Sequence, residues 1–154
     1  MYQAPTIRLI SMDTLPIDDS LLSILHDKAL KSPRKRINFD LRTTPNDSSQ
    51  RMLNVMEPGT IVPIHRHLET SETIICLEGC LDWVIYEGVA VSEAEGIDAE
   101  KEYATDNDHF TEIARYRICP REQKYGIQVP PMTWHTVEVY EPSTILEAKD
   151  GAYR

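Results

Sequence analysis

The sequence predicts an all-β protein built as a sandwich or a barrel. From Gln50 onward, β-prone runs of similar length follow one another with only short breaks. Turn signals separate these runs at Pro58-Gly59, at residues 68–71 and at Glu78-Gly79. Strands at such short and regular spacing favour a sandwich or barrel over units in which strands alternate with helices.

The chain is expected to form one domain over residues 1–154, because this length suits a single hydrophobic core. Residues 1–45 are expected to form an N-terminal extension with a strand and a helix, and residues 46–154 to form the barrel. Residues 89–111 interrupt the barrel with a strongly acidic stretch, which we interpret as a solvated loop. A long loop of this kind could also serve as an active-site lid.

The N-terminal extension begins with a β-prone run at residues 6–12, which could pair with the main sheet or with a second subunit in a homodimer. Apolar residues recur at helical spacing in residues 13–30, so this stretch predicts a helix. His26 falls among its polar positions and is expected to be solvated. The basic run at residues 31–36 is interpreted as a solvated loop, with a phosphate contact as the alternative.

The sheet is expected to resume after the acidic stretch. β-prone runs occupy residues 112–119 and 125–129, with a polar turn at residues 120–124 between them. A further alternating run begins at His135, and residues 143–149 are expected to close the sheet.

Composition limits the partners and the compartment. With 16 basic and 25 acidic residues the formal net charge is −9, which disfavours binding to nucleic acid or to an anionic membrane surface. No apolar run is long enough to span a bilayer, and the N-terminus lacks the layout of a secretory signal. The three cysteines, Cys76, Cys80 and Cys119, form no CxxC pair. They favour reduced thiols in a cytoplasmic protein, with Cys76 and Cys119 in the core.

Two histidines mark a candidate metal site. His65 and His67 lie two residues apart in a run with strand character, so their side chains leave the same face. A polar turn follows, and Glu72 opens the next β-rich run. If the two runs pair as a hairpin, Glu72 returns beside the histidines. Two imidazole nitrogens and one carboxylate oxygen then form a facial set of metal ligands.

The spacing of this stretch resembles the first motif of the cupin superfamily. That motif consists of a glycine, the His-x-His pair, a glutamate and a second glycine. Gly59, His65, His67, Glu72 and Gly79 fill these positions. The resemblance implies a jelly-roll β-barrel that binds one divalent metal ion.

Residues 130–135 resemble the second cupin motif, in which a proline precedes a histidine by five residues. The resemblance makes His135 the fourth metal ligand. Three positions depart from the motif, since Met132 replaces the turn glycine, Lys124 the leading glycine and Val139 the trailing asparagine. The first two departures concern the local turn and leave the ligand set unchanged.

Residues 33–88 and 126–153 together resemble the small cupin metalloproteins called the WbuC type. Relatives of this type are associated with bacterial surface-polysaccharide gene clusters. The resemblance therefore implies a small-molecule ligand, such as a sugar or a sugar derivative.

Three imidazoles and one carboxylate leave a six-coordinate metal with two open positions. Fe, Zn, Mn and Ni all suit such ligands, so the ligand set does not distinguish among them. An enzyme also needs a proton carrier near the metal. Glu147 and Lys149 alternate on one strand face and are candidates if that face is the barrel interior. Arg51 and Tyr125, in runs that flank the two motifs, are further catalytic candidates.

Two functions are compatible with these residues. The first is a metalloenzyme that isomerises, epimerises or oxidises a small polar molecule, with a sugar derivative as the expected substrate class. The second is a metal-dependent module that binds or senses a saccharide without turnover, and it stays open because the sequence shows no dedicated catalytic base. A metal-free epimerase is disfavoured, because the complete ligand set is present.

Overall fold

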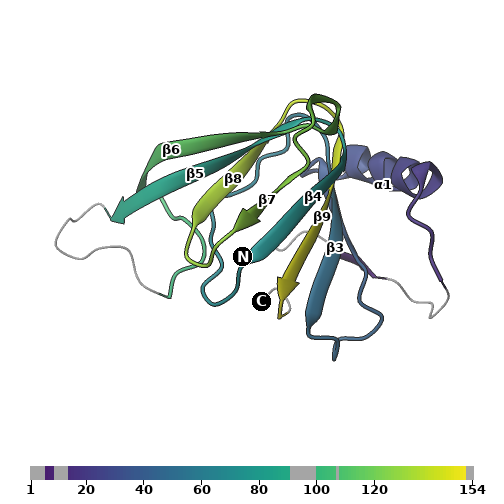
Figure 1. Cartoon of the computed structure of the whole chain (residues 1–154), viewed down its shortest axis with the longest axis horizontal. Coiled ribbons are helices and arrows are strands. Elements are labelled where there is room, and N and C mark those ends of the chain that lie inside the picture. Colours follow the sequence, from purple (N-terminus) through teal and green to yellow (C-terminus); the bar gives the residue numbers. More distant parts are fainter. Residues whose placement is uncertain (1–5, 9–13, 91–99, 107, 152–154) are drawn as a thin grey trace.

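The computed structural model describes residues 6–8, 14–90, 100–106 and 108–151. Strands dominate this part of the chain and form two sheets, which confirms the predicted all-β class (Figure 1). The larger sheet has the strand order β1-β2-β3-β9-β4-β7, and the smaller sheet has the order β6-β5-β8. The pairing of β1 with β2 is parallel, and the other strand pairs are antiparallel.

The order of the strands in space differs from their order in the sequence. The last strand, β9, lies between β3 and β4, so it joins strands that precede and follow the histidine-rich segment. In chain order the elements are β1 (Thr6–Arg8), α1 (Asp19–Lys31), β2 (Arg36–Asp40), β3 (Ser49–Met56), β4 (Glu72–Glu78), β5 (Leu81–Ala90), β6 (Asp108–Ile118), the 3-10 helix η1 (Pro120–Glu122), β7 (Gly126–Val129), β8 (Trp134–Val139) and β9 (Ser143–Asp150).

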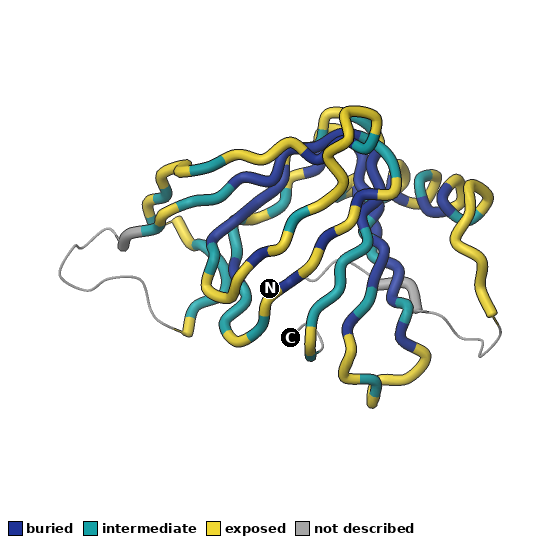
Figure 2. Tube along the Cα trace, viewed as in Figure 1, coloured by how far each residue is buried: buried dark blue, intermediate teal, exposed yellow. Residues whose placement is uncertain are grey.

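The main hydrophobic core lies between the two sheets. β4 shows how the sequence builds it, because Ile74 and Cys76 are buried while Ile75 and Leu77 between and after them are exposed. Alternation of this kind places one face of a strand in the core and the other in solvent, and it is visible along the strands in Figure 2. The buried members of this cluster are Met56, Ile74, Cys76, Leu81, Trp83, Ile118, Val129, Val137 and Ile145.

Helix α1 covers the outer face of the larger sheet beside β2 and β3 (Figure 1). The helix begins later than the stretch 13–30 predicted, because the side chain of Asp18 accepts a hydrogen bond from the Leu21 backbone N–H at 3.0 Å and caps the first turn. Leu22 and Leu25 pack with residues of β2 and β3 in a second hydrophobic cluster. The described chain therefore has two apolar clusters instead of one, and it has no helix with the length and apolarity that crossing a bilayer requires.

His26 is not solvated as predicted. Its Nδ1 lies 2.7 Å from a carboxylate oxygen of Glu57, and its Nε2 lies 2.6 Å from one of Glu78. The prediction failed because the polar side of α1 packs against the ends of β3 and β4, which are distant in sequence. His26 thereby attaches the helix to the barrel, and Thr144 of β9 also lies within hydrogen-bond distance of its ring at 3.2 Å.

The flanks of the acidic stretch belong to strands. The prediction of a loop over residues 89–111 is wrong at both ends, because β5 continues to Ala90 and β6 begins at Asp108. The two strands pair along this extension, so backbone hydrogen bonding overrides the polar composition. Residues 91–99 and 107 lie outside the described residues, as does most of the predicted strand at residues 6–12.

Candidate metal centre

The segment that carries His65 is attached to β8 by its backbone. His65 N–H donates to the carbonyl of His135 at 3.0 Å, and His135 N–H donates to the carbonyl of His65 at 2.9 Å. Met132 N–H donates in the same way to the carbonyl of His67 at 2.7 Å. This pairing brings the two predicted histidine motifs together although about 70 residues separate them in the sequence.

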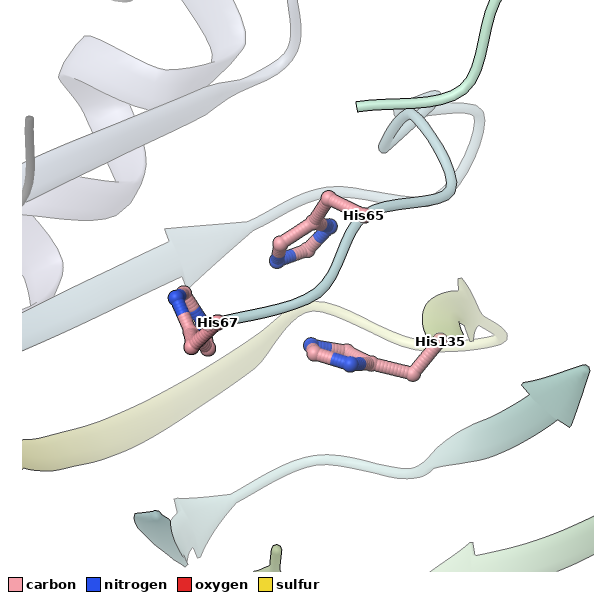
Figure 3. A group of neighbouring side chains, drawn as sticks. All are labelled: His65, His67 and His135. Carbon is pink, nitrogen blue, oxygen red and sulfur yellow. The ribbon is translucent and has the colours of Figure 1, made fainter. Parts of the chain in front are cut away.

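The three histidine rings meet at one point (Figure 3). Each offers one nitrogen, and these three atoms lie within 4.8 Å of one another. The ring centroids of His65 and His135 are 4.2 Å apart, and that of His67 lies 5.4 Å from His65 and 5.7 Å from His135. The arrangement is the one that nitrogen donors of a single metal ion require.

Backbone carbonyls fix the orientation of two of the rings. Nδ1 of His65 lies 2.9 Å from the carbonyl oxygen of Pro63, and Nδ1 of His135 lies 2.8 Å from that of Thr133. A carbonyl oxygen only accepts, so both Nδ1 atoms carry the proton and both Nε2 atoms carry a lone pair in the neutral ring. Nε2 of His135 is buried and has no hydrogen-bond partner within the described residues. Metal-binding histidines are usually held in this way.

The electrostatic surroundings keep these rings neutral. Desolvation by the protein, followed by repulsion from His135, lowers the pKa of His65 to about 3. Burial is also the main cause that lowers the pKa of His135 below its usual range. Metal binding requires the unprotonated imidazole, so both side chains are in the required state near pH 7.

Glu72 supplies the carboxylate. It opens β4, is 1% exposed, and its Oε2 lies 2.8 Å from Nε2 of His67. The three histidine nitrogens form a compact group. The Glu72 carboxylate is joined to that group by its contact with His67. Neutral imidazoles and a buried carboxylate are together a suitable donor set for a divalent transition metal.

The two glycines that frame the first motif have backbone angles that favour glycine. Gly59 has φ of 91° and Gly79 has φ of 100°. A side chain at Gly79 would also collide with Ser143 at the start of β9. These turns set where the histidine segment leaves β3 and where β4 ends, so they hold the donors in place.

Aromatic rings support the histidines from both sides. Trp83 of β5 stacks on His135, with ring centroids 5.0 Å apart and planes inclined by 18°. Tyr103 stacks on His65 at 5.9 Å and 23°. Tyr103 belongs to residues 100–106, which pair with the histidine segment through Arg66 N–H to the carbonyl of Glu102 at 2.8 Å. Part of the acidic stretch therefore lies directly beside the candidate site.

A pocket of about 390 Å³ opens at His65 and His67. This volume lies in the range of small-molecule sites. Its walls come from the histidine segment, the described part of the acidic stretch and the end of β9, namely residues 65–70, Glu102, Tyr103 and residues 149–151.

The catalytic candidates fall into two groups. The register of β9 against β4 pairs Cys76 with Ile145, Ile74 with Glu147 and Glu72 with Lys149, so Glu147 and Lys149 share the inward face of the core residues. Lys149 lines the pocket, and its Nζ donates to the carbonyl of Gly151 at 2.9 Å. Burial, followed by the charge of Glu72, raises the pKa of Glu147 well above its usual range.

Arg51 and Tyr125 are not brought to the histidines. Arg51 pairs with Asp47 at 2.8 Å, next to the start of β3. Tyr125 is 58% exposed just before β7, and neither residue lines the pocket. Tyr103, by contrast, was not predicted as a site residue. An aromatic residue within an acidic stretch was the one available signal.

The arrangement of the two sheets is a cupin-like fold, which several solved structures share. E. coli ycfD is similar in structure, with a TM-score of 0.51 and 18% identity over 68% of this chain and 26% of its own length. KdgF from Halomonas sp. has a TM-score of 0.51 and 13% identity over 79% of this chain and 83% of its own. The capsular polysaccharide assembling protein CapF from Staphylococcus aureus has a TM-score of 0.50 and 14% identity over 76% and 27%. The chain thus spans about a quarter of ycfD and of CapF.

Sequence comparison assigns the chain to one protein family. The chain belongs to the family described as Domain of unknown function (DUF6016), whose model matches residues 17–95. That range includes α1, the whole first histidine motif and all of β5. No curated protein matches the sequence.

Proposed function

We propose that the chain is a mononuclear metal-dependent cupin, of the WbuC type, that acts on a small sugar or sugar derivative. The orientation of His65 and His135 is the observation that carries the proposal. Both rings donate Nδ1–H to a carbonyl two residues earlier, which leaves both Nε2 lone pairs for a cation. With His67 and Glu72, they would hold one divalent ion, for which Fe, Zn, Mn and Ni are the candidates.

A bound ion of this kind supplies Lewis-acid or redox chemistry to a substrate carbonyl or hydroxyl pair. The residues of the chain bind and orient the substrate. Tyr103 closes one side of the pocket beside His65 and limits the access of water. Lys149, which also lines the pocket, provides a positive charge for a hydroxyl or carboxylate oxygen of the substrate.

Glu147 is the preferred proton carrier. Its raised pKa gives the carboxyl group a protonated population closer to neutral pH than an ordinary glutamate has. It faces the barrel interior opposite Ile74, and it precedes Lys149 by two residues on the same face of β9. A proton moved at this carboxyl group suits isomerisation or epimerisation next to a carbonyl, whereas oxidation would rely more on the metal.

The sugar class is supported from two directions. The resemblance to WbuC-type proteins implies it, and CapF is described as a capsular polysaccharide assembling protein. The pocket is also rimmed by polar side chains, among them Glu69, Thr70 and Glu102, which offer hydrogen bonds to hydroxyl groups.

A saccharide-binding module without turnover is the second candidate. One observation favours it, since Glu147 is not among the described residues that line the pocket. Glu72→Ala separates the two functions, because loss of the carboxylate ligand should abolish catalysis and leave part of a binding function.

The test is turnover by metal-loaded protein. Protein loaded with Fe(II), Mn(II), Zn(II) or Ni(II) is incubated with a panel of aldoses, ketoses and nucleotide sugars, and products are followed by NMR. The proposal predicts a product with at least one metal, and a loss of about 10²–10⁴-fold in rate for Glu147→Gln if this residue carries the proton. Glu87→Gln, at an exposed position of β5, is the matched control.

Saturable sugar binding that survives Glu147→Gln and Lys149→Met, with no product from any loaded form, would establish the binding module instead. Protein that neither binds a sugar nor turns one over with any of the four metals would refute the sugar proposal.

A further inference from the structure

A second cluster of metal-binding side chains lies near the other end of the small sheet. Leu81 of β5 pairs with Ile118 of β6, and Cys80 and Cys119 occupy the next opposing positions. His135 of β8 pairs with Ile85 of β5. Cys80 precedes Ile85 by five residues, which corresponds to about 16 Å along β5 at the usual rise per residue. The cluster is therefore separate from the histidine centre.

Three donors converge in this cluster. The sulfur atoms of Cys80 and Cys119 and a carboxylate oxygen of Glu122 lie within 4.8 Å of one another. Oε2 of Glu122 is 3.8 Å from Sγ of Cys80. Two thiolates and a carboxylate are three of the four ligands of a tetrahedral zinc site, and solvent or a second carboxylate oxygen can complete it.

The backbone holds the donors in these positions. Cys119 and Lys124 exchange two hydrogen bonds, at 2.7 and 3.2 Å, and η1 forms the short turn between them. Gln123 completes the turn with φ of 60°, so Glu122 is folded back toward Cys119. On the other strand, Cys80 N–H donates to Oγ of Ser143 at 3.1 Å. Ligands placed on strands and a tight turn need little rearrangement to bind an ion.

Charge and access also suit a cation. Nη1 of Arg117 lies 3.7 Å from Sγ of Cys80 and 3.7 Å from Oε2 of Glu122. Two thiolates, one carboxylate and a divalent ion carry a net charge of −1, which this guanidinium offsets. The two cysteines are 3% and 0% exposed, whereas the side chain of Glu122 is 43% exposed, so an ion can enter from its side.

We propose that Cys80, Cys119 and Glu122 form a second metal site, for a thiophilic divalent ion such as Zn²⁺, that joins the start of β5 to the turn after β6. A disulfide between the cysteines is the alternative. The placement of Glu122 favours the ion, because a carboxylate beside both sulfurs can coordinate a cation but takes no part in a disulfide bond. The proposal is independent of the function proposed for the histidine centre.

Cobalt substitution tests the site directly. Co(II) bound to thiolate produces an intense charge-transfer band in the near ultraviolet, which histidine and carboxylate ligands do not produce. Titration of the reduced protein with CoCl₂ should give this band and two bound cobalt ions per chain. The Cys80→Ser/Cys119→Ser variant should lose the band and one cobalt ion, and His65→Ala/His135→Ala should keep the band.

The exposed ligand provides a variant that does not threaten folding. Glu122→Gln should weaken the cobalt affinity measured by the band about tenfold or more, and Glu141→Gln, an exposed neighbour in a surface ion pair with Arg121, should not. A folded, reduced wild-type protein without the band would overturn the proposal. So would a band that persists in the double cysteine variant, or a Cys80–Cys119 disulfide that forms in air while the reduced form binds no cobalt at the cysteines.

Discussion

Among single residues, Met132 is held in a backbone conformation that L-residues rarely adopt. Its φ is 65°, in the left-handed region, at the turn that leads into β8 and His135. The turn is fixed because Met132 N–H donates to the carbonyl of His67 at 2.7 Å. The cupin motif has glycine here, so this chain keeps the turn geometry at a conformational cost.

Met132→Gly should therefore stabilise the protein by up to about 1 kcal/mol, because glycine adopts this conformation without strain. The Met132 side chain is 44% exposed, so little apolar burial is lost. Met132→Ala removes the same side chain without relieving the backbone and should be neutral or destabilising. Urea unfolding of the three proteins measures the difference. A glycine variant no more stable than the alanine variant would show that the backbone at Met132 is not strained.

Residue spacing predicts the ligands better than it predicts their surroundings. His65, His67 and His135 are recognisable because strand alternation and motif spacing are local properties of the sequence. Tyr103 and the partners of His26 are not recognisable in this way. Their contacts join segments 31 or more residues apart, and nothing in the neighbouring sequence encodes which segments meet.

At the level of elements, the small sheet depends on one buried carboxylate. Asp82 of β5 accepts from Nε of Arg117 at 2.6 Å, from Arg115 at 3.2 Å and from the Tyr140 hydroxyl at 2.7 Å. Both arginines belong to β6, whose outer residues are largely exposed. The edge strand is thus attached by charge as well as by its backbone ladder.

Asp82→Asn should destabilise the protein at pH 7 by about 1–3 kcal/mol, since it removes the charge that the two arginines contact. Burial alone would raise the pKa of Asp82, but the hydrogen bonds from Arg117, Tyr140 and Arg115 outweigh it and lower the pKa below its usual value. A lowered carboxylate pKa stabilises the fold above the unfolded pKa of about 3.9, and that contribution is lost as the pH falls through the folded pKa.

The wild type should accordingly lose more stability than Asp82→Asn between pH 5 and pH 2, as measured by denaturant unfolding at each pH. Asp27→Asn, in an exposed pair with Lys31 on α1, should change stability by less than about 0.5 kcal/mol. If the free energy of unfolding changes with pH in the same way for the wild type and Asp82→Asn, Asp82 is not the source of the pH dependence of stability.

Elements with a strong local β preference were predictable, and those decided by pairing were not. The strand β4 was expected because Glu72 opens a run rich in β-branched and apolar residues. The extension of β5 and β6 into the acidic stretch was missed, because the strands gain hydrogen bonds from each other that composition does not reveal.

Across the whole molecule, the candidate metal site connects distant parts of the chain. His65 and His67 follow β3, Glu72 opens β4 and His135 lies on β8 of the other sheet. An ion held by all four would therefore bind the two sheets to each other. Such an ion stabilises the native state alone, because the unfolded chain cannot assemble the ligands.

Chelation should lower the melting temperature of metal-loaded protein. At a free metal concentration one hundred times the dissociation constant, binding contributes about 2.7 kcal/mol, which is about 5–10 °C for a chain of this length. Calorimetric scans with and without EDTA measure the shift. The shift should persist in Cys80→Ser, which lacks the second proposed site, and disappear in Cys80→Ser/His135→Gln. An equal shift in these two variants would exclude the histidine centre as its source.

Anomalous scattering from a crystal of the metal-loaded protein, collected on both sides of the metal absorption edge, tests the histidine centre most directly. One strong peak should lie about 2.0–2.3 Å from Nε2 of His65 and His135, a ring nitrogen of His67 and a carboxylate oxygen of Glu72. Loaded crystals without a peak at this position, or with a peak that His135 does not contact, would contradict the four-ligand centre.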